Sequence, residues 1–138
     1  MPDNDFVLRP IAIIRSSLKD IAQAPMQGSE GAPDAWLDVD SAFADALAGL
    51  AVGNDIIVIT WLHQSDRSVL KTHPRSDPNR PLMGVFATRS PDRPNPLGLH
   101  RVTILEIAGN RIKVGPIEAI DGTPVVDMKV VLAQVADS

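Results

Sequence analysis

The sequence predicts a mainly β protein, a closed or nearly closed antiparallel β-barrel with one short helix. Short apolar segments rich in β-branched residues recur along the chain, and turn dipeptides separate them. Only one stretch, SAFADALAGL, places apolar residues at helical spacing. No G-x-G-x-x-G or Walker sequence follows a strand-like segment, so a Rossmann nucleotide site is not expected.

The first two strands are expected at residues 6–14 and 35–39. The segment FVLRPIAII is apolar and β-branched, and Pro10 suggests an edge or a bend in it. The segment AWLDV alternates apolar and polar residues, as a short strand does. Between them, QAPMQGSEGAP is rich in turn-forming residues and predicts an exposed loop.

The helix is expected to begin at Ser41. Its apolar residues share one helical face, namely Ala42, Phe43, Ala46, Leu47 and Leu50. Ser41 or Asp40 can cap the first turn, and Gly53-Asn54 can end the helix.

The strongest strand signal is DIIVITWLH at residues 55–63, a nearly continuous β-branched run that predicts burial on both faces. Further strands are expected at residues 83–88, 99–107, 111–117 and 125–132. Gly109-Asn110 predicts a tight turn between two of them, and Asp121-Gly122 is a second turn signal.

The length of 138 residues predicts one domain, spanning residues 1–138. The chain has no cysteine, which excludes disulfides and thiolate metal sites and fits a reducing compartment. The start of the chain, MPDNDFVLRP, does not resemble a signal peptide, and no apolar run is long enough to span a bilayer. A soluble, cytoplasmic protein is therefore expected.

The charge is unevenly distributed along the chain. The net charge is −4, yet residues 63–101 hold seven basic and three acidic residues, and the remainder holds six basic and fourteen acidic residues. All three histidines also lie in this basic window. If these residues share a face, that face can attract a phosphate or another anion; the alternative is a solvated loop whose charges only confer solubility.

The most unusual segment is GVFATRSPDRPNPLGLHR at residues 84–101. Pro91, Pro94 and Pro96 stiffen its backbone, which lowers the entropic cost of binding a ligand there. Arg89 and Arg93 are four residues apart, and their guanidinium groups suit a carboxylate, a phosphate or a purine face. A ligand site is favoured over a rigid connection whose arginines pair with local acids.

Two other classes of site have weak support. A serine hydrolase would need an activated nucleophile, but no G-x-S-x-G occurs, and Ser65 and Ser90 lie near a histidine or an acid only in sequence. The spacing of His63, His73 and His100 contains no H-x-x-x-H or H-x-E element, so no metal site is expected.

The turn Asp121-Gly122-Thr123-Pro124 is a further candidate. It offers a carboxylate, a hydroxyl and backbone amides, which suit a ribose or an amino acid head group. The same residues are also common as a plain turn before a strand.

Two stretches together resemble a known family. The segments GVFATRSPDRPNPLGL and DGTPVVDMK resemble the two signatures of the TrmO/TsaA-like (YaeB-like) proteins, and the N-terminal half of the chain fits as well. Members of that family are S-adenosylmethionine-dependent tRNA methyltransferases with an unusual β-barrel fold. They act as homodimers and methylate N6 of the threonylcarbamoyl-adenosine next to the anticodon.

The resemblance implies S-adenosylmethionine as cofactor and tRNA as partner. The implied cofactor residues are Pro25, Met26, Gln27, His63, Gln64, Arg89, the Leu99 backbone, Asp121, Gly122, Thr123 and Pro124. Candidate contacts to the anionic substrate are Arg67, Arg75, Arg80, Arg93 and Arg101. Asn95 or Asp121 is the candidate acceptor for the proton of the methylated amine, so these two are the expected catalytic residues.

The chain also departs from the family pattern. Met26 stands where the family usually has arginine, Lys129-Val130-Val131 replaces Lys-Pro-Tyr, and the chain has no tyrosine. It is also expected to lack the C-terminal domain with which longer members bind tRNA. Two alternatives stay open: a non-catalytic β-barrel that binds S-adenosylmethionine, and a methyltransferase for another anionic substrate.

Overall fold

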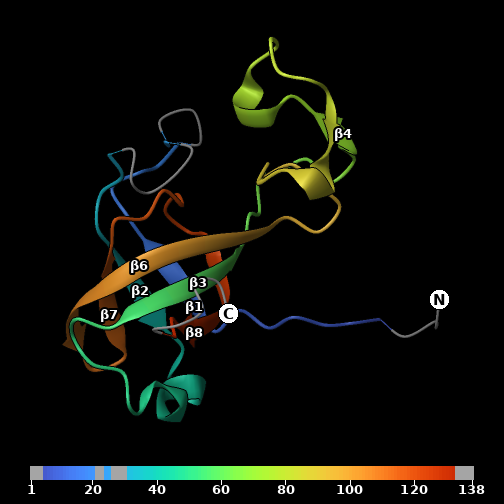
Figure 1. Ribbon diagram of the computed structural model, residues 1–138. Helices are drawn as coiled ribbons and strands as arrows, with labels where there is room; N and C mark the ends of the chain where they lie inside the picture. The colour runs from blue at the N-terminus through green and yellow to red at the C-terminus, as the bar shows by residue number, and fades with distance from the viewer. Residues whose placement is uncertain (1–4, 21–23, 26–30, 133–138) are drawn as a thin grey trace.

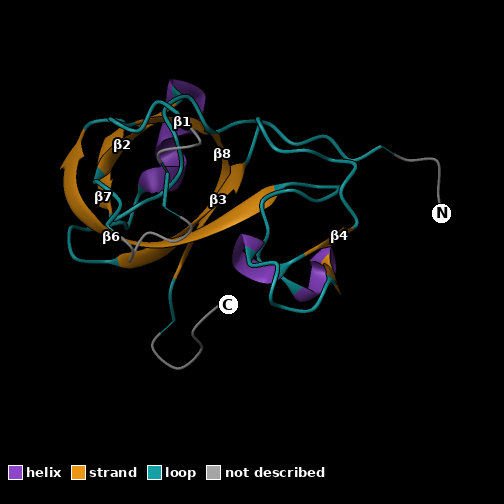
Figure 2. Cartoon of the chain, turned by 90° about the horizontal axis from the view of Figure 1, so that it is seen from above, coloured by secondary structure: helices purple, strands orange, loops and turns teal. Residues whose placement is uncertain are grey.

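The computed structural model describes residues 5–20, 24–25 and 31–132, which contain a closed barrel of antiparallel strands (Figure 1). The barrel strands are β1 (Ala12–Arg15), β2 (Ala35–Val39), β3 (Asp55–Trp61), β6 (Leu97–Ala108), β7 (Arg111–Gly115) and β8 (Pro124–Val130). Their order around the barrel is β1-β2-β7-β6-β3-β8, which Figure 2 shows as a ring seen from above. The prediction of a mainly β, antiparallel barrel is confirmed.

Alternating side chains fill the interior of the barrel. In β6, the inward positions Gly98, His100, Val102 and Ile104 are buried, while the positions between them face outward. The other strands contribute Ala12, Ile14, Ala35, Leu37, Val39, Ile56, Val58, Thr60, Ile112, Val114 and Val125. Each buried aliphatic side chain contributes roughly 1.5–3 kcal/mol, so this interior is the main source of stability.

The connections between strands divide the barrel into two ends. Residues 16–34, 62–96 and 116–123 connect strands at one end, which we call the upper end. Residues 40–54 and the turn Gly109-Asn110 lie at the other, lower end. In Figure 1 the upper end points to the top of the view.

The longest connection, residues 62–96, forms a lobe above the barrel (Figure 1). It contains a two-stranded sheet of β4 (Lys71–Thr72) and β5 (Met83–Gly84), and the short 3-10 helices η4 (Pro74–Ser76) and η5 (Val85–Ala87). Val85 is fully buried and its N–H donates to the carbonyl of Leu70 at 2.9 Å. Most of the lobe is exposed, so polar contacts contribute much of its stability.

Two strand predictions were wrong in extent. β1 begins only at Ala12, and Phe6, Val7 and Leu8 are exposed in an extended arm. Strand pairing with β8 starts beyond Pro10, which has no N–H to donate. The strand expected at residues 83–88 ends at Gly84, because the chain then turns into η5. The strand expected at 35–39 is present with the predicted bounds, and those expected at 55–63, 99–107, 111–117 and 125–132 are present with shifted ends.

The helix expected from Ser41 is a 3-10 helix, η3 (Ser41–Leu47), and it ends earlier than predicted. The side chain of Asp40 caps it by accepting from the N–H of Ala42 at 2.9 Å. Phe43, Leu47 and Leu50 pack against the barrel core, as the apolar face predicts. The β3 run is buried on its inner face and at Ile57, whereas the outer residues Ile59 and Trp61 are only half-buried.

Across the described part of the chain, none of the helices has the length and apolar character needed to cross a membrane.

Candidate functional site

The upper end of the barrel brings together three connections that carry predicted cofactor residues. Residues 16–34 include Pro25, which is half-buried, while Met26 and Gln27 lie outside the described residues. Residues 62–96 include His63, Gln64 and Arg89, and residues 116–123 include the turn that begins at Asp121. Antiparallel pairing explains this convergence, because β1, β3 and β7 all end where β2, β6 and β8 begin.

Strand register places the remaining predicted residues, Leu99 and Pro124, on strands that flank β3. Leu99 of β6 pairs with Ile59 of β3, and Thr60 of β3 pairs with Val125 of β8. Pro124 therefore lies close to the end of β3, from which His63 and Gln64 follow two and three residues after Trp61. β7 pairs with β6 only from Thr103 onward, so the first part of β6 has one edge without a neighbouring strand in the described structure. Such an edge offers backbone N–H and C=O groups to a ligand.

Asp121 is held by contacts on both carboxylate oxygens. Oδ1 accepts from the backbone N–H of Ser16 at 2.9 Å, and Oδ2 is 3.1 Å from Nζ of Lys19. The hydrogen bond from Ser16 lowers the pKa of Asp121, partial burial opposes this, and the positive charges of Lys19 and Arg15 lower it further. Asp121 is thus an ionised carboxylate and a weaker base than an ordinary aspartate.

The rest of the turn presents mainly backbone. Thr123 is buried, and its hydroxyl donates to the carbonyl of Ile120 at 2.7 Å. Gly122 has a φ of 85°, a conformation that favours glycine, and its N–H donates to the carbonyl of Ile14 at 2.7 Å. Pro124 pairs with Ile13. A ligand here would meet the surface of a rigid turn.

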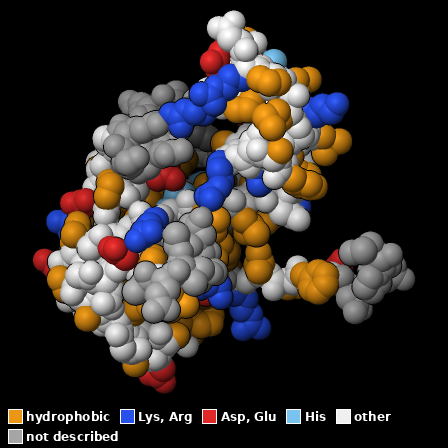
Figure 3. All heavy atoms as spheres, in the orientation of Figure 1, with side chains coloured by type: hydrophobic (Ala, Val, Ile, Leu, Met, Phe, Trp, Pro, Cys, Tyr) orange, Lys and Arg blue, Asp and Glu red, His pale blue; other side chains and the backbone are white. Residues whose placement is uncertain are grey.

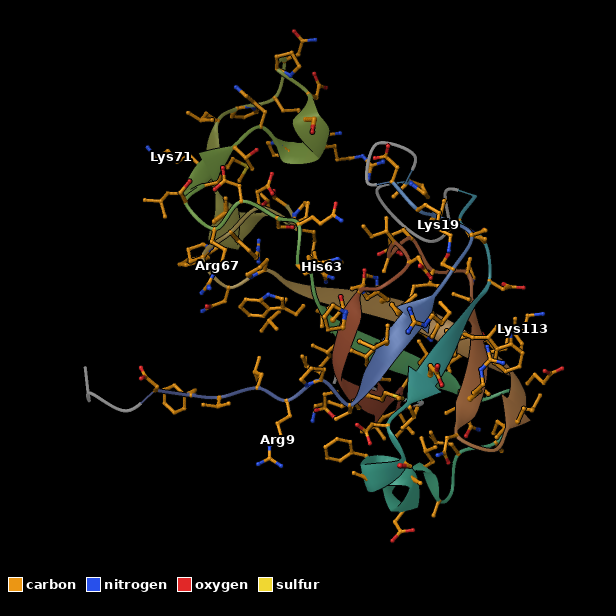
Figure 4. All side chains as sticks on the ribbon, turned by 180° about the vertical axis from the view of Figure 1, so that it is seen from behind. Arg9, Lys19, His63, Arg67, Lys71 and Lys113 are labelled. Carbon is orange, nitrogen blue, oxygen red and sulfur yellow. The ribbon has the colours of Figure 1, made fainter. Side chains whose placement is uncertain are left out.

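His63 and Gln64 are exposed where the lobe joins the barrel. Figure 4 shows His63 at this junction, Arg67 farther into the lobe, and Lys19 on the neighbouring 16–20 segment. A turn closes directly after β3, since the N–H of Ser65 donates to the carbonyl of Leu62 at 3.0 Å.

The side chain of Arg93 is hydrogen-bonded to backbone carbonyls of the proline-rich loop, the segment that carries Pro91, Pro94 and Pro96. Its Nε donates to the carbonyl of Ser90 at 2.9 Å, and its Nη2 donates to the carbonyls of Thr88, at 2.7 Å, and Val85. One guanidinium thus satisfies carbonyls at the first residue of η5, at its C-cap and beyond it. The sequence predicts a substrate contact for Arg93 and does not reveal this structural role, because no sequence signal identifies the carbonyls that Arg93 reaches.

The start of the lobe is hydrogen-bonded to the same loop. Nε of Arg67 donates to the carbonyl of Pro94 at 2.7 Å, and its guanidinium carbon lies 5.0 Å from the centre of the Trp61 ring. The N–H of Asp66 donates to Oδ1 of Asp92 at 2.8 Å. Hydrogen bonds from the hydroxyl and N–H of Ser68 in turn lower the pKa of Asp66.

Asn95 takes part in this network as well. Its Oδ1 accepts from Nη2 of Arg67 at 3.3 Å, and the residue is exposed. The amide oxygen that would accept a proton therefore already faces a cation.

The other predicted arginines spread over the molecule. Arg75, Arg80 and Arg89 lie exposed in the lobe, and Nε of Arg80 is 3.8 Å from Oδ2 of Asp77. Arg101 lies on the outer wall of β6, where Nη2 is 3.7 Å from Oδ2 of Asp55. On the face shown in Figure 3, Lys and Arg side chains follow the side of the lobe toward the barrel, and hydrophobic side chains cover much of its other side.

Sequence reasoning missed one buried cluster beneath this end of the barrel. His100 is 5% exposed, and its ring nitrogens contact Thr60 and Glu118 at 2.7 Å and 2.5 Å. The sequence carried a signal for it, because His100 alternates with apolar inward residues of β6.

The described residues contain no group of three or more His, Asp or Glu side chains able to hold a metal ion. A hollow lined by Pro10, Ala12, Ile13, Asp38, Val39 and Asp40 lies at the lower end of the barrel and includes no predicted site residue. The upper end, with its exposed cations, rigid turn and open strand edge, can bind a ligand that combines an anionic group with a flat heterocycle.

Comparison with known proteins gives relatives over nearly the whole chain. The probable S-adenosyl-L-methionine-binding protein of Methanothermobacter thermautotrophicus is 39% identical over 129 residues, which cover 94% of this chain and 92% of that protein. The S-adenosyl-L-methionine-binding protein of Archaeoglobus fulgidus is 38% identical over 123 residues, which cover 89% of this chain and 87% of that protein.

Solved structures agree with this result. A crystal structure of TrmO from Pseudomonas aeruginosa matches with a TM-score of 0.75 and 27% identity, and the match covers 98% of this chain and 61% of that one. A second crystal structure of TrmO matches with a TM-score of 0.76 and 30% identity over 98% of this chain and 62% of that one. This chain thus spans about three-fifths of the length of the solved TrmO chains, as the covered shares of 61% and 62% show.

The tRNA-methyltransferase O N-terminal domain family matches residues 13–137, and this protein therefore belongs to that family.

Proposed function

We propose that the upper end of the barrel binds S-adenosylmethionine. The observation that carries this proposal is the convergence of three connections bearing the expected cofactor residues, next to an unpaired edge of β6. That edge includes the backbone of Leu99, which can hydrogen-bond to an adenine ring. The names of two relatives as S-adenosyl-L-methionine-binding proteins support the same cofactor.

The protein acts as a methyltransferase, and its substrate is the threonylcarbamoyl-adenosine next to the anticodon of tRNA, which it methylates at N6. Membership of the tRNA-methyltransferase O N-terminal domain family supports this substrate. The lobe supports it as well, because residues 62–96 hold six basic residues and three acidic ones in a chain with a net charge of −4. Arg75 and Arg80 are exposed there and can contact phosphates without reading sequence.

The cofactor supplies an electrophilic methyl group on a sulfonium, so the protein mainly has to position the two reactants. Arg89 holds the carboxylate of the cofactor, and the turn that begins at Asp121 supports its ribose. The loop that the Arg93 hydrogen bonds hold in place presents the substrate. The guanidinium of Arg93, or that of Arg67, can face the carboxylate of the modified adenosine.

Asn95 and Asp121 are the candidate acceptors for the amine proton. Both are weak ones, because the amide oxygen of Asn95 accepts from Arg67 and the pKa of Asp121 is lowered by its hydrogen bond from Ser16. A weak acceptor suffices to orient an amine N–H, and the proton can leave to water after methyl transfer.

Calorimetry with S-adenosylmethionine tests the cofactor, and absence of binding at millimolar cofactor would overturn the proposal. Labelled cofactor is then incubated with tRNA from a strain that lacks this methylation. Label transferred to that tRNA, and not to tRNA from the parent strain, is the expected result.

A non-catalytic cofactor-binding barrel is the second candidate, which the names of the relatives favour. Cofactor binding without label in tRNA or in other anionic acceptors is the result that supports it.

We also propose that the protein is a cytoplasmic homodimer, as the family resemblance implies. Phe6 and Val7 of the arm and Leu70 and Phe86 of the lobe are exposed apolar side chains that an interface can cover. Light scattering coupled to gel filtration measures the mass, and a monomer at micromolar concentration would contradict a dimer.

A further inference from the structure

A chain of three polar side chains lies beneath the candidate site. Nε2 of His100 is 2.7 Å from Oγ1 of Thr60, and Nδ1 of His100 is 2.5 Å from Oε1 of Glu118. Thr60 is 0% exposed, His100 is 5% exposed, and the side chain of Glu118 is 19% exposed. The chain therefore runs from the inside of the barrel to its upper rim.

The order hydroxyl, imidazole and carboxylate is also the order of a nucleophile, a base and an orienting acid. A nucleophile must reach a substrate, however, and the hydroxyl of Thr60 has no exposed surface. The arrangement is thus not a hydrolytic site, and its role has to follow from the segments that it connects.

Each of the three residues belongs to a different segment of the candidate site. Thr60 lies on β3 three residues before His63, and His100 lies on β6 directly after Leu99. Glu118 lies in the 116–123 connection, three residues before Asp121.

Strand pairing already joins β3 to β6 and to β8 at this level, but it does not join the 116–123 connection to β6. The contact between His100 and Glu118 links the 116–123 connection to β6. On its other side, the 116–123 connection is hydrogen-bonded to β1 and to the residues that follow β1. The N–H of Gly122 donates to the carbonyl of Ile14, and the N–H of Asp121 donates to the carbonyl of Leu18, both at 2.7 Å.

The hydrogen bonds also fix the imidazole ring. The carboxylate of Glu118 can only accept, so Nδ1 of His100 carries a proton. In the neutral ring, Nε2 then accepts from the hydroxyl of Thr60. Both partners are needed, because a buried polar atom left without a hydrogen bond is unfavourable.

The glycine of the N-P-L-G sequence leaves the space for this contact. A Cβ atom at position 98 would lie 2.5 Å from Oγ1 of Thr60 and 2.7 Å from Nε2 of His100. Both distances are far below a normal contact, so a side chain there would displace the hydrogen bond.

We propose that His100 is a positioning residue that sets cofactor affinity. Held between Thr60 and Glu118, it keeps the 116–123 connection at a fixed distance from β3 and β6. The turn at Asp121 then stays in place relative to His63 and the Leu99 backbone. This inference rests on the proposed function, because it takes the cofactor to bind these residues.

The test compares two variants of one buried residue. Thr60→Val keeps the shape and removes the hydroxyl, whereas Thr60→Ser keeps the hydroxyl and removes a methyl group. The matched control is Thr103→Val, which removes the 2.7 Å hydrogen bond from Oγ1 of Thr103 to Oδ1 of Asp55. That bond joins the same two strands at the lower end of the barrel.

The first readout needs no cofactor. Hydrogen exchange of the backbone amides of residues 118–122 is expected to be several-fold faster in Thr60→Val, and unchanged in Thr60→Ser and Thr103→Val. The second readout is calorimetry with S-adenosylmethionine. Loss of one buried hydrogen bond predicts roughly tenfold weaker binding to Thr60→Val, and affinity close to the wild type for the other two variants.

The outcomes separate this proposal from the proposed function. Wild-type protein that fails to bind the cofactor overturns the proposed function, and the exchange experiment then still tests the link made by His100. If Thr60→Val exchanges and binds like the wild type, or if Thr60→Ser is impaired as much as Thr60→Val, the positioning role is wrong. Should Thr60→Val not fold, Glu118→Gln and Glu118→Ala give the same comparison from the rim, and equal effects of these two would overturn the proposal.

Discussion

Oδ1 of Asp121 accepts a hydrogen bond at 2.9 Å from the backbone N–H of Ser16, a residue 105 positions earlier in the chain. In the opposite direction, the N–H of Asp121 donates to the carbonyl of Leu18 at 2.7 Å. These bonds fasten the 16–34 connection to the 116–123 connection at the upper end of the barrel. Asp121, which family resemblance assigns to the cofactor, thus also holds two of the three site segments together.

The Asp121 contact predicts a pH-dependent contribution to stability. Because the folded-state pKa of Asp121 lies below its ordinary value of about 4, the ionised carboxylate stabilises the fold above that pH. This contribution is lost as the pH falls from about 4 through the lowered folded-state value. Asp121→Asn should therefore lower the urea midpoint at pH 7, and the difference from wild type should shrink at pH 3.

Asp45→Asn is the control for this measurement, because Asp45 is exposed in η3 at the lower end of the barrel. A difference between Asp121→Asn and wild type that stays the same at both pH values would contradict the assigned cause.

Arg93 should be needed for the order of the proline-rich loop. Arg93→Lys keeps the charge but loses the fork that reaches the carbonyls of Ser90, Thr88 and Val85. We expect severalfold faster hydrogen exchange in residues 85–90 and weaker tRNA binding. If Arg93→Lys binds tRNA normally with unchanged exchange, then the guanidinium does not organise the loop.

Arg89 is expected to separate cofactor binding from tRNA binding. Arg89→Ala should weaken S-adenosylmethionine binding beyond detection by calorimetry, because the proposed site assigns this cation to the cofactor carboxylate. Arg80→Ala, a substitution of another exposed lobe arginine, is the matched control and should bind the cofactor like the wild type. Equal losses in both variants would show that Arg89 has no specific part in the cofactor site.

Gly98→Ala should disturb the barrel at the candidate site. The added Cβ would lie 2.5 Å from Oγ1 of Thr60, and forcing an atom into a packed interior costs roughly 1–3 kcal/mol. A lower thermal midpoint together with weaker cofactor binding is the expected result. Gly53→Ala serves as a comparison, because its Cβ would meet nothing within 4 Å and any cost there comes only from its positive φ of 94°. A wild-type thermal midpoint for Gly98→Ala would refute this account.

The proposed contacts from the lobe to tRNA phosphates predict a salt dependence. Each lost contact should reduce the slope of log affinity against log salt by roughly 0.7–0.9. Arg75→Ala and Arg80→Ala should each show such a reduction in filter binding across salt concentrations. Arg111→Ala should leave the slope unchanged, because Arg111 lies at the lower end of the barrel, 4.7 Å from the Trp36 ring centre. A slope that these lobe substitutions do not change would move the tRNA surface elsewhere.

The barrel and its strands were predictable because they depend on local patterns. The alternation in AWLDV matches β2 residue for residue, and the β-branched run from Asp55 matches β3. The turns at Gly109 and Gly122 were also predictable from local pattern, namely the turn dipeptides Gly109-Asn110 and Asp121-Gly122. Both glycines adopt positive φ in the structure. The extent of the strand in FVLRPIAII was not predictable, because apolar composition does not show whether a partner strand is available.

The candidate site was likewise predictable only where it depends on local sequence. The chain alone determined which residues are unusual: the prolines of residues 84–101, the arginines around them and the turn at Asp121. Whether an arginine faces a ligand or a carbonyl depends on contacts between distant segments, and composition carries no information about these. Asp121 bound to Ser16, and His100 placed between Thr60 and Glu118, were therefore decided by closure of the barrel, which brings these groups within hydrogen-bonding distance. The contact of Arg93 with Val85 was decided by the fold of the lobe itself, which brings together two residues eight positions apart.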